Sequence, residues 1–70
     1  MKIEIEICKR AMDYWTDETG QKRPKYHAQI KDAPGYWSCG RSRTEAIGHL
    51  IMEYSKKFNV KICNLGDLAR

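Results

Sequence analysis

Long apolar runs are missing from this 70-residue sequence. A membrane-spanning helix needs about 18 or more consecutive apolar residues, and no stretch approaches that length. No signal peptide is visible either, because Met1 and Lys2 lead directly into an alternating strand pattern. We therefore expect a cytoplasmic protein without a membrane segment.

Paired cysteines are also lacking. Cys8, Cys39 and Cys63 are odd in number and far apart, and no C-x-x-C motif occurs. Neither His27 nor His49 stands at metal-ligand spacing from any of them. The sequence predicts reduced thiols that serve as small strand residues, with no metal and no cofactor.

Convergent acids and activated nucleophiles, which mark many enzymes, are missing as well. Glu4 and Glu6 point to one face of a predicted strand, but no further acid is predicted beside them. Magnesium-dependent nuclease chemistry needs several carboxylates around the metal. His27 and His49 have no Ser, Cys or Asp at a predictable triad distance, and no Gly-rich phosphate loop occurs. We expect a chain without catalytic activity.

The residues that are present are typical of one small folded domain. Hydrophobic residues make up 41% and charged residues 31% of the chain, a balance that argues against disorder. A length of 70 residues leaves room for a single domain over residues 1–70. A chain of this size buries only about 60% of its unfolded surface, so we expect a stability of a few kcal/mol unless a partner adds more.

Alternation of apolar and polar residues predicts four strands, over residues 3–8, 26–31, 36–39 and 60–63. Residues 9–25 show no clear period and contain many turn-forming residues. We therefore expect a long connection between the first and second strands.

A tight turn is predicted at Asp32-Ala33-Pro34-Gly35. Asp can bond to its own backbone, Pro presets φ, and Gly accepts a positive φ. Because this turn is short, the strands on either side of it are expected to form an antiparallel hairpin.

One helix is predicted after this hairpin. Ser42 and Glu45 have the spacing of a capping box, and Asn59 can close the helix in a left-handed conformation. Gly48 is expected to let the helix pack closely on the sheet. The apolar face, with Leu50 and Ile51 in the core, comprises Ala46, Ile47, Leu50, Ile51, Tyr54 and Phe58.

These elements predict an α+β fold of order β-β-β-α-β, in which one helix packs on a small, mainly antiparallel sheet. We expect Trp37 to lie beneath the helix. The last residues, 64–70, are expected to form a short tail, with Leu65 and Leu68 against a sheet edge.

The stretch from Tyr26 to Ile51 resembles the HicB family of antitoxins. The family pattern has an aromatic-led strand, an Asp-x-Pro-Gly turn, a short strand, a Gly, a Ser or Thr cap, and Glu-Ala at the start of an amphipathic helix. The matching residues, in order, are Asp32, Pro34, Gly35, Gly40, Ser42, Glu45 and Ala46. The resemblance implies a single HicB-like domain with a reduced ribonuclease-H-like fold.

The resemblance also implies a partner. HicB-type antitoxins neutralise small HicA-type toxins that cleave mRNA, and they do so by covering the toxin's active site. Many also carry a C-terminal DNA-binding module, which is not visible in these 70 residues, so we expect no direct DNA binding. A small open sheet has unpaired edges that favour a homo-oligomer.

The net charge of +4 leaves a second function open. A small basic RNA-binding module would use aromatic rings to stack on bases and basic side chains to contact phosphates. For RNA, the stacking rings would be Trp15, Tyr36 and Trp37, close to the basic residues Lys22, Arg23, Lys25, Arg41 and Arg43. The candidate partner-binding residues as a whole are Tyr14, Trp15, Lys22, Arg23, Lys25, Arg41 and Arg43.

Overall fold

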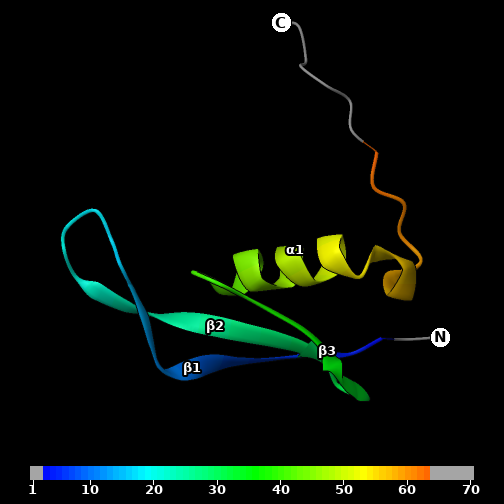
Figure 1. The fold of residues 1–70 in the computed structure, drawn as a ribbon, viewed down its shortest axis with the longest axis horizontal. Coiled ribbons are helices and arrows are strands. Elements are labelled where there is room, and N and C mark those ends of the chain that lie inside the picture. The colour runs from blue at the N-terminus through cyan, green and yellow to red at the C-terminus, as the bar shows by residue number, and fades with distance from the viewer. Residues whose placement is uncertain (1–2, 64–70) are drawn as a thin grey trace, which may run out of the picture.

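The fold combines three strands with one helix. The computed structural model describes residues 3–63, so the expected tail with Leu65 and Leu68 lies outside the described residues. An α-helix and a short 3₁₀ helix follow the strands, and the α+β prediction is confirmed (Figure 1). The elements are β1 (Ile5–Thr16), β2 (Lys22–Ile30), β3 (Ala33–Gly40), α1 (Arg43–Glu53) and the 3₁₀ helix Ser55–Phe58.

The strands form one antiparallel sheet in the order β1-β2-β3. Ala28 of β2 pairs with Ile7 on one side and with Ser38 on the other. Because paired residues point to the same face of a sheet, this register gathers apolar side chains beneath α1, which crosses that face (Figure 1).

The predicted connection over residues 9–25 is wrong. β1 continues to Thr16 and β2 begins at Lys22, so most of this segment belongs to a long hairpin. The pairing register shifts between Lys9 and Tyr14, and Met12 within that interval has a φ of 58°. A bulge of this kind interrupts the alternation of side chains, which explains why the sequence shows no period there.

The turn between β2 and β3 comes earlier than predicted. Ile30 pairs with Ala33, which leaves Lys31 and Asp32 as the turn. Pro34 and Gly35 lie inside β3. They form a bulge there, because Ile30 pairs with Ala33 while the preceding residue, Gln29, pairs with Trp37, which leaves residues 34–36 without partners in the ladder. A proline at a bulge in an edge strand loses no ladder hydrogen bond.

The predicted start of the helix is confirmed. Ser42 has extended backbone angles and its side chain accepts a hydrogen bond from the Glu45 N–H at 3.1 Å. The Glu45 carboxylate reaches back one residue further than a capping box requires, and accepts from the Arg41 N–H at 3.1 Å. These bonds satisfy N–H groups that a helix end would otherwise leave unpaired.

The end of the helix differs in part from the prediction. α1 stops at Glu53 and the chain continues as the 3₁₀ helix, which Asn59 closes in the predicted left-handed conformation with a φ of 55°. The fourth strand over residues 60–63 is not formed. Figure 1 shows this segment, in orange, leading away from the sheet, so it has no strand beside it to pair with.

The core is small. Ala28 and Ile30 of the sheet meet Ala46 and Leu50 of α1, and Leu50 is fully buried. Ile51 is only half-buried and does not join this cluster, which corrects the prediction for that residue. The partly buried side chains packed around the core are Ile5, Ile7, Tyr26, Ala33, Tyr36, Ile47, Tyr54 and Phe58.

Close packing of α1 on the sheet depends on Gly40 and not, as predicted, on Gly48. A Cβ added at Gly40 would lie 2.6 Å from the Ala46 backbone nitrogen, whereas one at Gly48 would meet no atom within 4 Å. The end of β3 can therefore approach the first turn of α1 only because residue 40 lacks a side chain.

Across residues 3–63, no helix is long and apolar enough to cross a membrane.

Candidate binding surfaces

The face of the sheet opposite α1 carries a cluster of polar and aromatic side chains. We call it the open face and define it by Glu6, Cys8, Arg10, His27, Gln29, Trp37 and Cys39. The expectation that Trp37 packs beneath the helix is wrong. The register partner of Trp37 is Gln29, and both side chains point away from α1. Trp37 is 43% exposed.

Trp37 is held in place by its neighbours on the open face. Its ring stacks on His27 with centroids 5.1 Å apart, and the Arg10 guanidinium lies 5.5 Å from the ring centroid. His27 Nε2 donates to Gln29 Oε1 at 2.8 Å, and Gln29 Nε2 donates to Glu6 Oε1 at 3.1 Å. These contacts fix a large aromatic ring on an otherwise uncovered surface.

The open face also aligns two thiols with a histidine. Cys8 and Cys39 are both register partners of His27, one from each neighbouring strand, and both thiols are free. The three side chains form a row across the sheet, in which neighbouring strands lie about 4.8 Å apart. Within residues 3–63, no three His, Cys, Asp or Glu side chains are grouped to hold a metal ion.

A second surface lies where the β1–β2 hairpin approaches the start of α1. There four cations and two aromatic rings line a hollow of about 570 Å³, which we call the basic hollow. Its charged and aromatic residues are Lys9, Arg23, Arg41, Arg43, Trp15 and Tyr26. The far half of the hairpin bends toward the N-terminal end of α1 in Figure 1, and the bulge around Met12 is where the ladder allows that bend.

Two arginines of the basic hollow lie over aromatic rings. The Arg41 guanidinium is 5.3 Å from the Trp15 centroid, and that of Arg43 is 5.9 Å from the Tyr26 centroid. Neither Arg41 nor Arg43 forms an ion pair with a described carboxylate. A cation over an aromatic ring gains electrostatic stabilisation while its N–H groups stay free at the edge.

Arg23 is positioned by the loop at the tip of the hairpin. Its Nε donates to Asp17 Oδ2 at 2.8 Å. Hydrogen bonds from the Thr19 hydroxyl and from Arg23, together with the Gln21 and Thr19 backbone N–H groups, hold the pKa of Asp17 well below its ordinary value near 3.8. Asp17 is therefore ionised at neutral pH and keeps the loop closed.

The structure brings together some of the predicted contact residues. Trp15, Arg23, Arg41 and Arg43 meet in the basic hollow, as predicted for a joint surface. The other three do not line it: Lys25 lies 3.6 Å from Asp13, and Tyr14 and Lys22 are exposed elsewhere on the hairpin.

Sequence reasoning missed Lys9 and Tyr26 as members of this site. They belong to it because they pair directly across β1 and β2. A cross-strand pair has no signature in either segment alone, and the alternation of apolar and polar residues in the first strand ends at Cys8.

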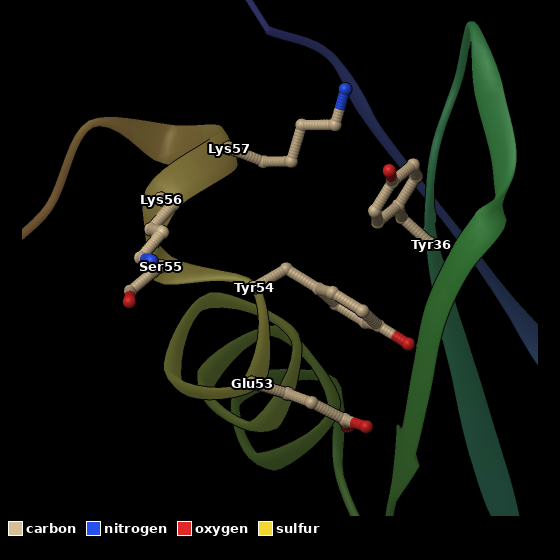
Figure 2. Close-up of a pocket in the computed structure, with 6 residues that line it drawn as sticks. All are labelled: Tyr36, Glu53, Tyr54, Ser55, Lys56 and Lys57. Carbon is tan, nitrogen blue, oxygen red and sulfur yellow. The ribbon is translucent and has the colours of Figure 1, made fainter.

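A third hollow, of about 440 Å³, lies between the end of α1 and the β3 edge (Figure 2). Tyr36 and Tyr54 meet edge to face with centroids 5.0 Å apart, and Lys57 Nζ is 4.7 Å from the Tyr36 centroid. Figure 2 shows the Glu53 side chain directed toward β3 beside them. This hollow combines one acid with two lysines and thus has no strong preference for either charge.

No match to this chain was found among protein-family models, curated proteins or solved structures.

Proposed function

We propose that this chain is a non-catalytic protein-binding domain of the HicB antitoxin type. It would dock on a small HicA-type ribonuclease toxin and cover that toxin's active site. Residues 26–51 resemble the HicB family. One structural observation supports the same function: Trp37 is exposed and fixed on the open face.

Trp37 supports protein binding for an energetic reason. Tryptophan and arginine are the side chains most enriched where binding energy concentrates in protein interfaces. Trp37 is 43% exposed, and both its stacking on His27 and its contact with Arg10 are already formed. A partner that covers it would gain a large apolar burial at a small cost in side-chain ordering.

The charge of the open face is compatible with a basic toxin. A net charge of +4 would slow encounter with a basic partner if it were spread evenly. The open face is close to balanced, since Glu6 and Arg10 both lie on it, while Lys9, Arg23, Arg41 and Arg43 gather at the basic hollow.

The proposal predicts a HicA-like open reading frame beside this gene, and the test uses the protein that this frame encodes. Calorimetry should give a dissociation constant for the wild-type pair, and Trp37→Ala should weaken binding about 10- to 100-fold, as loss of an interface anchor does. Met52→Ala is the control, because Met52 is 60% exposed on α1 and away from the open face. Lack of binding by the wild type, or an unchanged constant for Trp37→Ala, would contradict the proposal.

The non-catalytic part of the proposal has its own test. Labelled single- and double-stranded RNA incubated with the protein and Mg²⁺ should remain intact. Metal-dependent cleavage that disappears on substitution of Glu4 or Glu6 would show instead that the strand carboxylates are catalytic.

A further inference from the structure

The basic hollow has the charge of an anion site, and three of its four cations have no ion-pair partner among the described residues. The residues that line it include four cations and no carboxylate. Arg23 is engaged with Asp17, but Lys9, Arg41 and Arg43 make no ion pair with a described carboxylate. Like charges drawn together in this way repel each other, and a bound anion would relieve that repulsion.

The cations converge from segments far apart in the sequence. Lys9 comes from β1, Arg23 from β2, Arg41 from the bend between β3 and α1, and Arg43 from the first residue of α1. The rings of Trp15 and Tyr26 hold the two guanidiniums of Arg41 and Arg43. A planar guanidinium held by its face presents its N–H groups as a fork, which suits a phosphate or carboxylate.

A polyanion with phosphates fits this hollow better than an acidic segment of a protein. Single arginines are enriched in protein–protein interfaces, but charged residues as a group are depleted from the centre of such interfaces. In the basic hollow the charges lie at the centre. Arg41 and Arg43 already cover one face of each of its two aromatic rings, so these faces are not available for apolar contact with a partner protein. Interfaces with nucleic acids are much more positively charged and more polar.

The residues of the hollow favour a single strand. Its volume of about 570 Å³ is in the range of a small-ligand pocket. A positively charged groove that follows the phosphate backbone is a common part of sites that bind a single strand without base-specific contacts.

We propose that the basic hollow binds the phosphate backbone of single-stranded nucleic acid. The site is separate from Trp37 and the open face, so this activity does not depend on the protein-binding function proposed above. Arg41 and Arg43 contact phosphates as preorganised forks, and Lys9 adds a flexible charge at the rim.

Fluorescence anisotropy with a labelled oligouridylate of about 12 nucleotides tests the proposal. The R41A/R43A double variant should bind at least about tenfold more weakly at low salt, and the slope of log K against log salt should fall by about 1.4, as two lost phosphate contacts predict. K56A/K61A removes the same charge from two exposed lysines outside the hollow and is the matched control. Equal losses for the two double variants would overturn the proposal, because they would show a response to net charge alone.

Competition decides which class of anion the hollow accepts. Unlabelled oligouridylate should displace the probe, whereas a polyglutamate of equal charge should not. Displacement by polyglutamate at the same concentration would assign the hollow to an acidic protein instead. Should R41A/R43A fail to fold, Lys9→Glu against Lys61→Glu repeats the comparison with exposed residues, and a loss confined to Lys9→Glu is the result expected.

Discussion

Single side chains carry much of the stability of this domain, because few of them are buried. Among the described residues the core comprises Ala28, Ile30, Ala46 and Leu50, and Leu50 is the largest fully buried side chain. A domain of this size has only a few kcal/mol of net stability to lose.

Leu50→Ala should lower the free energy of unfolding by about 2–5 kcal/mol, since it leaves a cavity between α1 and the sheet. Ile51→Ala in the same turn of α1 should cost less, because Ile51 is half-buried and outside the core cluster. Urea denaturation monitored by circular dichroism measures both. A midpoint for Leu50→Ala close to that of the wild type would contradict the packing described here.

Asp17 should make stability depend on pH in the acid range. Its pKa is depressed in the folded state, mainly by the Thr19 hydroxyl and then by Arg23, so its contribution is present above the unfolded pKa, which is about 3.9. That contribution is lost as the pH falls below about 4 toward the lower folded pKa.

The comparison of wild type with Asp17→Asn checks this sign. The variant should be less stable at pH 7, and the difference should shrink as the pH is lowered below about 4. A gap between wild type and Asp17→Asn that widens in acid would disprove the assignment.

Among the elements, the contact between β3 and α1 is the most demanding. The backbone of α1 approaches Gly40 so closely that a Cβ there would lie 2.8 Å from the Glu45 carbonyl carbon. Backbone atoms of a capped first turn have little room to move, and so the contact excludes every side chain at residue 40.

Substitutions of two glycines separate packing from helix propensity. Gly40→Ala should destabilise the domain by about 1–3 kcal/mol through overpacking. Gly48→Ala should stabilise it by about 1 kcal/mol, because the added methyl meets no atom within 4 Å and alanine favours the helix. Thermal melts of the two variants should therefore shift in opposite directions, and shifts of the same sign would refute the packing argument.

Over residues 3–63, the molecule is thin and extended. The extents are 41 × 36 × 15 Å and the radius of gyration is 14.5 Å, against about 11 Å for a compact chain of this length. No described element covers the face of the sheet opposite α1, and β1 and β3 are the edges of the sheet. Such a shape leaves apolar surface and backbone groups that a second copy or a partner can cover.

Self-association is the corresponding prediction. Sedimentation velocity at micromolar concentration should show a dimer or a larger species, because oligomerisation adds the buried apolar area that a small core lacks. A strict monomer across that concentration range would show that the sheet edges do not pair with a second copy. Only the partner protein could then cover the open face.

Features governed by near neighbours in the chain could be predicted from the sequence. The Ser42 cap, the left-handed Asn59 and the β2–β3 hairpin each depend on a few adjacent residues, whose conformational preferences are strong. The apolar period of α1 likewise placed Ala46 and Leu50 in the core.

Features governed by pairing between strands could not be predicted from the sequence. A shift of one residue in register turns every side chain of a strand to the other face, and bulges at Met12 and Pro34 introduce such shifts. The second turns Trp37 away from α1, and the first lets the hairpin bring Trp15 and Arg41 together. The open face and the basic hollow thus depend on cross-strand register, which emerges only when distant segments pair.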